Sequence, residues 1–443
     1  MSGPPAELLA YSIDPETLHE VPQQPELLAR WLEDALEWPE PEDRVMAYRQ
    51  HTWIGQAARM MRRLDVAEQH LTAALRLAEG HGSPQSVLLA RIRLAHVHQW
   101  QGRFRQATTE FERCLREGRQ ELSGENYAFV LQHAGKAYYE AGHWTRAREL
   151  FAEALRWRTE HGVDRKLVDS SRLALDGADA CVVAENVATV LDRLVAQATE
   201  RAGGRAADLV AEHGLSGRQR TVLSVLRPLL LAGPVPVDLA TGVLDAGEEE
   251  LVPRTGARLA EELAAGLVPG AVGWASAEED LHGALSDLVA TGWLQEQEGW
   301  LRAEERCRRL LVELTTLLDR VAGELWAASG RVPVLLDLTG EVIDLAVGTA
   351  PGRGFGAVVT ALSATDTGPA GRLLDRFEAL RLYRAEARQA ARDIGRRAQD
   401  TGTAWMLVSA ATGRVAARPY RLLGAERRAV LLAELRALLG HPA

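Results

Sequence analysis

Histidines are the side chains in this sequence that come closest to a pattern for metal chemistry. His96 and His98 are two positions apart, and His133 and His143 follow. On a helix each residue turns about 100°, so the rings of a His-x-His pair point about 200° apart. Because such a pair cannot hold one ion, we expect these histidines to line a groove or pack between helices. We predict no metal and no cofactor.

Patterns for catalysis are missing from the rest of the sequence. His213 and His282 are the only histidines between residues 182 and 440, and no GxSxG or HExxH motif occurs. A GxxxxGK[ST] motif is also absent, which excludes a P-loop NTPase. The glycine-rich run Gly348–Gly356 lacks lysine and is not expected to open a helix, so we interpret it as a connecting loop. We predict that the protein is not an enzyme.

Arginines four positions apart mark a long helix that we expect over about 369–399. The basic stripe consists of Arg384, Arg388, Arg392 and Arg396 and is extended by Arg381 and Arg397. Residues 372–443 contain fourteen Arg against seven Asp or Glu, a net charge of +7, whereas the whole chain carries −10. The stripe suits an acidic protein surface or nucleic acid. In the alternative interpretation it is a solvated face, partly balanced by Glu386 and Asp393.

Length and composition indicate a protein of several domains without membrane spans. A chain of 443 residues predicts two or three domains, and its negative charge argues against non-specific binding of nucleic acid by the whole molecule. Cys114, Cys181 and Cys307 are widely spaced, which favours a reducing cytoplasm. We see no secretory leader and no stretch near the roughly 20 apolar residues that cross a bilayer. Lys136 and Lys166 are the only lysines, which we interpret as the codon bias of a GC-rich bacterial genome.

A helical-hairpin pattern recurs three times at a spacing of 40 residues. Small residues stand at three matching points of each unit: Gly55, Ala95 and Gly135, then Ala67, Ala107 and Ala147, then Ala74, Cys114 and Ala154. Small side chains let the two helices of a hairpin approach closely, and large apolar residues wedge each hairpin into the next. The pattern predicts a stacked solenoid with a concave surface.

Residues 45 to 160 resemble the tetratricopeptide repeat family. The resemblance implies helix pairs that stack into a right-handed superhelix and bind peptides or protein segments. The period of 40 instead of 34 and the missing closing proline depart from the family pattern, so we expect longer helices or links. Capping helices are expected at Pro25–Leu32 and Asp169–Leu175, because an end repeat otherwise exposes an apolar face.

The resemblance also implies which side chains line the binding groove. They are Arg49, Thr52, Gln56, Arg59 and Met60 from the first unit, Leu89, Ile92, His96, Gln99 and Trp100 from the second, and Phe129, Gln132, Lys136, Tyr139 and Glu140 from the third. Arg, Trp and Tyr are typical of binding hot spots, so we predict a protein or peptide ligand. The Lys and Asn clamp that some members use for a C-terminal carboxylate is absent. In the alternative interpretation several of these side chains only pack between helices.

Residues 205 to 305 resemble a winged helix. Short helices are expected from Leu215 and over Val237–Leu244, and a third over Leu281–Ala290 leads into a hairpin at 293–301. The expected third helix and wing are acidic, with Glu278, Glu279, Asp280, Asp287, Glu296 and Glu298. These carboxylates would face phosphates with the wrong sign, so we expect packing or partner contact instead of DNA binding.

The C-terminal part predicts a small α+β domain of no family that we recognise. A hairpin is expected from Val332–Leu338 and Val342–Val347, and further strands over Phe355–Leu362, Trp405–Ser409 and Val415–Tyr420. Asp337 and Asp344 can pair only in one register of that hairpin. A helix over Glu426–Leu439 closes the chain.

The sequence therefore predicts a mainly α protein. It comprises an N-terminal tetratricopeptide repeat solenoid (1–182), a winged-helix-like domain (183–326) and a small α+β domain (327–443). We expect a cytoplasmic bacterial adaptor or scaffold that binds a protein segment in its groove and a second partner through its C-terminal domains. The alternative is a transcriptional or nucleic-acid-associated regulator that uses the winged helix and the arginine stripe. An enzyme sited in the C-terminal domain is a third, weaker reading, and the sequence leaves the partner and the oligomeric state open.

Overall fold

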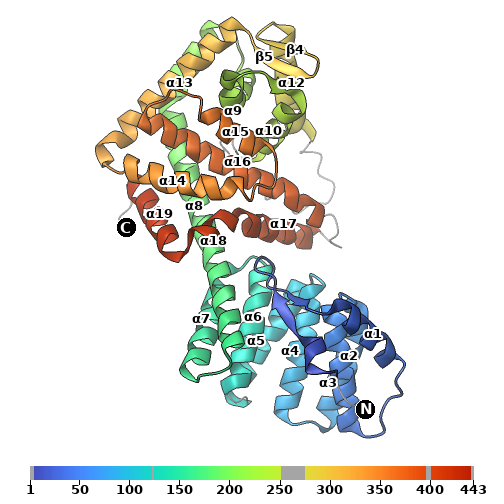
Figure 1. The fold of residues 1–443 in the computed structure, drawn as a ribbon. Coiled ribbons are helices and arrows are strands. Elements are labelled where there is room, and N and C mark those ends of the chain that lie inside the picture. Colours follow the sequence, from blue (N-terminus) through green and yellow to red (C-terminus); the bar gives the residue numbers. More distant parts are fainter. Residues whose placement is uncertain (1–3, 122–123, 251–274, 396–400, 441–443) are drawn as a thin grey trace. The chain divides into compact units, whose positions relative to one another are not determined.

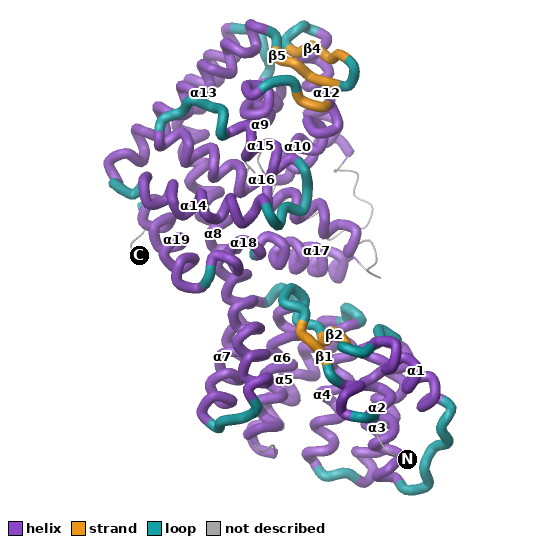
Figure 2. The backbone as a smooth tube through the Cα atoms, viewed as in Figure 1, coloured by secondary structure: helices purple, strands orange, loops and turns teal. Residues whose placement is uncertain are grey.

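Two compact units make up this chain, and both are mainly helical, as predicted (Figure 1, Figure 2). The computed structural model describes residues 4–121, 124–250, 275–395 and 401–440. The first unit is Met1–Asp179 and the second is Ala180–Ala443. Helix α8 (Arg165–Glu212) has residues in both units. Among the described helices, none is long and apolar enough to cross a membrane.

Three helical hairpins form the repeats of the first unit (Figure 1). They pair α2 (Arg44–Met60) with α3 (Leu64–His81), α4 (Pro84–Trp100) with α5 (Phe104–Glu121), and α6 (Gly124–Glu140) with α7 (Trp144–Glu160). Consecutive hairpins pack through α3 and α4 and through α5 and α6. Helix α1 (Pro25–Leu36) packs against α2 and buries Leu28 and Leu32, so it is the expected front cap. The predicted run of stacked hairpins is confirmed.

Glycines at the matching points of two hairpins let their helices touch. A Cβ atom on Gly55 would lie 2.5 Å from Cγ of Leu71, and one on Gly135 would lie 2.5 Å from the ring of Phe151. Real Cβ contacts are not this short, so any larger residue would push the two helices of the hairpin apart. The small residues recur every 40 positions because the two helices of each hairpin must approach closely at the same point.

The turns of the hairpins follow the same spacing. Gly102 and Gly142, which end the turns after α4 and α6, have left-handed backbone with φ of 76° and 83°. The matching residue of the first hairpin is Arg62, whose φ is 61°. A residue with a Cβ atom adopts this conformation at a cost in free energy, so the first turn is strained where the other two are not.

A short β-hairpin that the sequence did not predict precedes the repeats. It consists of β1 (Tyr11–Ile13) and β2 (Glu20–Pro22), which are antiparallel, and the 3-10 helix η1 (Ala6–Leu9) lies before it. Asp14 holds the turn, because its Oδ1 accepts hydrogen bonds from the backbone N–H groups of Glu16 and Thr17. We call residues 5–22 the N-terminal segment.

The second unit contains a three-stranded antiparallel sheet between helices. In chain order the elements are α9 (Gly217–Ala232), β3 (Val235–Pro236), α10 (Val237–Glu250), α12 (Ala275–Ala290), β4 (Leu294–Gln297) and β5 (Trp300–Ala303). The strand order is β3-β5-β4, so the first short strand pairs with the second arm of the hairpin.

The remaining described elements of the second unit are helices around α16 (Pro369–Gly395). They are α13 (Glu305–Trp326), the 3-10 helix η2 (Ala327–Ser329), α14 (Val332–Val347), α15 (Gly354–Leu362), α17 (Thr401–Ala416), α18 (Arg418–Leu423) and α19 (Ala425–Leu438). Helix α16 packs against α10, α13, α14, α15 and α17, which makes it the central helix of this unit.

The strands predicted for residues 327–443 are wrong. The expected hairpin at 332–347 is helix α14, which buries Leu335, Leu338, Val342 and Ala346 on one side at helical spacing. The other expected strands lie in α15, α17 and α18. Short apolar runs rich in Val and Leu fit a buried helix as well as a strand, and only their packing partners decide between the two. The C-terminal half does contain a small α+β region, but its strands lie within residues 235–303.

Candidate ligand-binding face of the first unit

Helices α2, α4 and α6 present side chains to the N-terminal segment, and we call this surface the inner face. Their positions correspond at the 40-residue spacing, so one row consists of Gln56, His96 and Lys136, and the next consists of Arg59, Gln99 and Tyr139. The spacing of three or four residues within each helix places both rows on one side of the hairpin stack. The inner face is where most of the predicted groove residues lie.

Glu20 of the N-terminal segment is buried at the centre of the inner face. Its Oε2 lies 2.7 Å from Nη1 of Arg59, and its Oε1 lies 2.7 Å from Nζ of Lys136. Only 4% of the Glu20 surface is exposed, and both cations are buried as well. Burial alone would raise the pKa of the Glu20 carboxyl, but the charges of Arg59 and Lys136 outweigh it and hold that pKa well below its ordinary value. The inner face therefore binds an ionised carboxylate through two cations.

His19 adds a second set of contacts beside Glu20. Its ring stacks on Trp100 with centroids 4.3 Å apart, and its Nε2 lies 2.9 Å from Oε2 of Glu140. Nη2 of Arg62 lies 2.8 Å from Nδ1 of His19, and the Arg62 guanidinium lies 4.2 Å from the centroid of Trp100. With its proton on Nε2, His19 accepts from Arg62 and donates to Glu140. The strained turn residue Arg62 thus contacts the segment directly.

The structure brings six predicted groove residues to the N-terminal segment. Besides Arg59, Lys136, Trp100 and Glu140, the Tyr139 hydroxyl donates to the carbonyl of Glu16 at 3.0 Å. His96 lies 3.9 Å from the Glu20 carboxylate. Gln99 supports the contact from behind, because its Nε2 donates to Oε2 of Glu140 at 2.8 Å.

The other predicted groove residues have different surroundings. Met60 and Ile92 pack in hydrophobic clusters between helices, as the alternative interpretation anticipates. Gln132 accepts a hydrogen bond from Ser171 at 2.7 Å, and Thr52 is buried. Arg49 is exposed, and Gln56, Leu89 and Phe129 are half-buried. The inner face is therefore partly repeat interior and partly accessible surface.

Glu20, His96 and His133 form a group whose metal-ligating atoms lie within 4.8 Å of one another. The donor set does not fit a divalent cation. Both Glu20 oxygens already contact the cations Arg59 and Lys136, and Trp100 donates from Nε1 to Nε2 of His96 at 3.1 Å. Burial, with some help from the neighbouring cations, lowers the pKa of both histidines well below the ordinary value. The group is suited to holding a carboxylate between neutral rings and two cations. His98 points elsewhere, toward Glu68 at 3.5 Å.

A pocket of about 160 Å³, which we call the uncovered pocket, lies along α4 and α6 beside the positions that hold the N-terminal segment. Its lining consists of Leu89, Arg93, Asn126, Phe129, Trp157, Arg158, Val163 and Leu167. Nη1 of Arg93 lies 3.4 Å from the Tyr48 hydroxyl, and its buried Nε has no hydrogen-bond partner within the described part of the chain. Burial lowers the pKa of Arg93. The pocket thus combines apolar walls with an incompletely paired cation.

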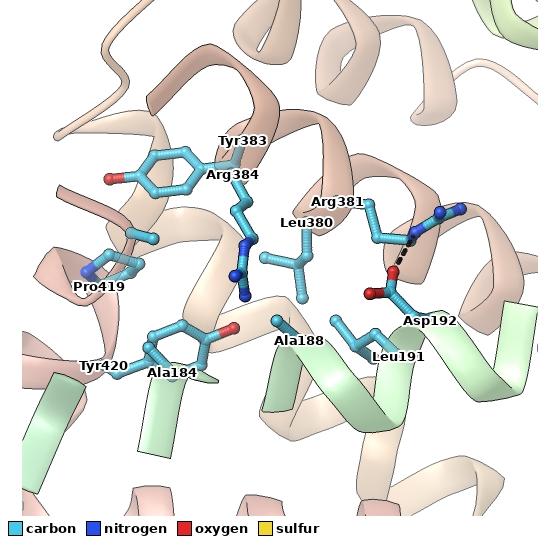
Figure 3. Close-up of a pocket in the computed structure, with 11 residues that line it drawn as sticks. Ala184, Ala188, Leu191, Asp192, Leu380, Arg381, Tyr383, Arg384, Pro419 and Tyr420 are labelled. Carbon is cyan, nitrogen blue, oxygen red and sulfur yellow. Dashed lines mark hydrogen bonds and ion pairs between the residues drawn. The ribbon is translucent and has the colours of Figure 1, made fainter. Parts of the chain in front are cut away.

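The arginine stripe of the second unit does not form one open surface. Arg381 is buried and its Nε lies 2.7 Å from Asp192 of α8, as Figure 3 shows. Arg384 extends from α16 toward Tyr420 in the same small pocket (Figure 3), and Arg388 and Arg392 are half-buried. Arg396 and Arg397 lie outside the described residues. A central helix must bury much of its surface, so Arg381 belongs to the unit's own packing, and the three half-buried arginines are only partly accessible.

Two other sequence hypotheses change in the second unit. Helix α15 begins within the glycine-rich run, at Gly354, so the expectation that this run opens no helix is wrong. The buried Glu386 carboxylate accepts a hydrogen bond from the backbone N–H of Phe355 at 3.0 Å, and a phosphate there would meet a like charge. Asp337 and Asp344 are exposed and lie two turns apart on α14, so they do not pair across a hairpin.

Sequence reasoning missed His19, Glu20 and Arg62, which form the contact with the segment, and Arg93, which lines the pocket. A signal existed for Glu20, because Arg59 and Lys136 fall at inner positions of the repeats, where buried cations need a carboxylate. The repeats themselves place only Glu140 among the predicted inner positions. The carboxylate that balances the charges of Arg59 and Lys136 is that of Glu20. Sequence spacing does not reveal it, because Glu20 and Lys136 are 116 positions apart.

Comparison with known proteins supports the assignment of the repeats. A tetratricopeptide repeat family model matches residues 86–160. No curated protein matches the chain. The crystal structure of BtubC (BKLC) from P. vanneervenii is similar to 34% of this chain, with 22% sequence identity and a TM-score of 0.28, and the match covers 63% of that protein's chain. The family model thus identifies tetratricopeptide repeat sequence within residues 86–160, and the run of helical hairpins around them is consistent with a solenoid of that family.

Proposed function

We propose that this protein is an adaptor whose inner face binds a segment of another protein. Tetratricopeptide repeats indicate a role in protein–protein interaction. The observation that carries the proposal is the short hairpin at residues 11–22, which belongs to no repeat and lies on the inner face through ion pairs, ring stacking and hydrogen bonds of Glu16, His19 and Glu20. The polar groups that hold these few residues can hold a segment of another protein in the same way.

Capture of a partner from the cytoplasm tests this function. Side chains in the uncovered pocket are suitable for substitution, because they are not part of the N-terminal contact. Arg93→Gln combined with Phe129→Ala should reduce capture of a co-purifying protein by about tenfold or more. Arg113→Gln with Arg165→Gln, at exposed positions, is the matched control and should capture normally. A partner that the first variant retains, with an unchanged circular dichroism spectrum, would argue against the inner face as its binding site.

The unit Ala180–Ala443 is proposed to bind a second partner. The excess of positive charge in residues 372–443 supports an acidic protein surface as that partner. Binding through charge should weaken as salt rises, which a titration of the captured complex with sodium chloride measures. Buried free thiols at Cys114, Cys181 and Cys307 support a reducing cytoplasm as the location.

A nucleic-acid-associated regulator is the second candidate function. The order α9-β3-α10-α12-β4-β5, with strands arranged β3-β5-β4, supports a winged helix. Glu296 and Glu298 are exposed at the hairpin tip, which opposes phosphate contact there. The discriminating experiment is a mobility-shift assay of the full chain with duplex DNA at low salt. A shift that salt abolishes favours the regulator, and an unshifted duplex rejects it.

A further inference from the structure

We infer that the N-terminal segment is an intramolecular occupant of the inner face, and that the partner which replaces it carries a glutamate or aspartate bound between Arg59 and Lys136. This inference rests on the proposed function, because it names the chemistry of the ligand and the way in which its access is controlled.

Charge requires a carboxylate at this place. Arg59, Lys136, His96 and His133 are all buried, and Glu20 is the group that contacts both cations. The two cations are buried while the segment covers them, so a replacement that covers them without a carboxylate would leave them uncompensated, which is unfavourable. A neutral segment would leave the same imbalance. The inner face therefore selects a ligand with a carboxylate at the position of Glu20.

The two strands of the segment contribute little apolar contact. Tyr11 and Val21 are 45% and 46% exposed, whereas Leu18 between the strands is fully buried and Leu8 and Leu9 of η1 pack against the hydrophobic cluster of α1 and α2. Strands of three residues do not form a stable hairpin on their own, so the inner face holds the segment in place. Leu18 and Arg62, two contact residues without glycine's freedom, both have left-handed backbone, with φ of 59° and 61°. When the segment is released, Leu18 no longer has to adopt its left-handed backbone conformation, and the cost of that conformation is lost.

The segment can leave without unfolding the repeats. Gln23 and Gln24, which connect it to α1, are both exposed. Helix α1 is fixed separately, because Leu28 and Leu32 are buried in the cluster that includes Ile54 of α2. The cap therefore keeps its own anchors, Leu28 and Leu32, when residues 5–22 move away and withdraw Leu8 and Leu9 from that cluster.

The uncovered pocket provides a place where an acidic partner binds first. Arg93 lies on α4, the helix that also carries His96 and Trp100, and its nearest hydrogen-bond partner within the described residues is the weakly acidic Tyr48 hydroxyl. A second carboxylate of the partner finds its counter-charge there while Glu20 still contacts Arg59 and Lys136. The uncovered pocket and the Glu20 site thus both favour an acidic segment by charge complementarity.

Peptide exchange tests the inference on the full chain. A protease recognition sequence is inserted between Gln23 and Gln24, and a fluorescent synthetic peptide of residues 4–22 is added after cleavage. Fluorescence anisotropy should report exchange of the labelled peptide into the cleaved protein. A Glu20→Gln peptide should bind about tenfold or more weakly, because it lacks the charge for Arg59 and Lys136. A Glu7→Gln peptide, changed at an exposed carboxylate, is the matched control and should bind like the parent. Equal binding of all three peptides, or no binding of the parent peptide, overturns the inference.

The uncleaved chain tests the intramolecular competition. A tethered segment has an effective concentration in the millimolar range, so the same peptide should bind the uncleaved chain at least about tenfold more weakly. Equal binding to the cleaved and uncleaved chains overturns the competition. A partner-capture experiment distinguishes the adaptor function from the carboxylate site. If the parent peptide exchanges but the cleaved chain captures no protein, the adaptor function fails and the carboxylate site stands. If a protein is captured equally with and without excess parent peptide, the carboxylate site fails as its binding site.

Discussion

Nζ of Lys136 lies 2.7 Å from Oε1 of Glu20, a residue 116 positions earlier in the chain that belongs to none of the repeats. Burial lowers the pKa of Lys136, and the Glu20 charge acts against that effect. Each group thus makes the charged form of the other tolerable in a buried place. Through this pair and Arg59, the N-terminal segment is part of the solenoid's own charge balance.

Removal of the Lys136 charge should destabilise the first unit. Lys136→Met leaves Glu20 buried with Arg59 as its remaining close cation, and breaking a buried pair from one side costs about 3 kcal/mol or more. Urea denaturation measures this free energy of unfolding. Lys166→Met, at the exposed second lysine, should change it by less than about 0.5 kcal/mol. The double variant Glu20→Gln with Lys136→Met should recover part of the loss, and strict additivity would contradict the direct coupling.

Acidification should weaken the first unit between pH 6.5 and 5. Burial lowers the pKa values of His96 and His133 well below 6.5, so both stay neutral in the folded unit while the unfolded chain takes up protons. Stability is therefore lost as pH falls below about 6.5, by up to about 2 kcal/mol at pH 5 for each ring that stays neutral. The low pKa of Glu20 preserves its own contribution over this range. Urea unfolding at pH 7.5 and pH 5 measures the change, and His133→Asn should make the pH dependence shallower. A stability that does not change over this range would contradict the buried neutral rings.

An added methyl group inside the third hairpin should also destabilise it. The Cβ atom of Gly135→Ala would lie 2.5 Å from the Phe151 ring, and such overpacking costs about 1–3 kcal/mol. Gly80→Ala is the control, because a Cβ atom there meets nothing within 4 Å and favours the helix. The two variants should shift the urea midpoint in opposite directions. Equal midpoints would mean that α6 and α7 can move apart freely.

In the second unit, Arg227 should be a sensitive position. Its Nη2 lies 2.6 Å from Oδ1 of Asp375 and 3.4 Å from Glu378, and both Arg227 and Asp375 are buried. Arg227→Met leaves the carboxylates without their cation, so we expect a loss of about 3–5 kcal/mol in the stability of this unit. Arg309→Met removes only an exposed pair with Glu305 and should change stability by less than about 0.5 kcal/mol. Thermal unfolding followed by circular dichroism compares them, and equal midpoints would contradict a structural role for the Arg227 pair.

The repeats could be predicted because their information is local and periodic. Gly55 and Gly135 mark close contacts with residues 16 positions away in the same hairpin, and the same requirement recurs every 40 residues. The inner positions Arg59, Trp100 and Lys136 could be predicted because the resemblance to the repeat family implies which positions of each unit line the groove. The register of the repeats determines on which side of the stack these side chains lie. It does not determine which residues they contact.

The secondary structure of residues 332–347 could not be predicted from local sequence alone. Their apolar side chains are compatible with two strands or with one helix. Val and Ile favour strands locally, so the sequence predicts a hairpin where the structure has helix α14. The packing of α14 against α16 and α18 selects the helix, and that packing depends on residues far away in the chain. Arg381 is a similar case, because its burial follows from the central place of α16 and not from its spacing.

The sequence by itself determined a solenoid of paired helices, its period, and the row of cationic and aromatic side chains on one face. Only the tertiary structure decided that residues 5–22 lie on that face and that Glu20 neutralises Arg59 and Lys136. The physical reason is that a helix requires only near neighbours for its hydrogen bonds and its apolar stripe. A buried charge requires a counter-charge from wherever the fold can supply one.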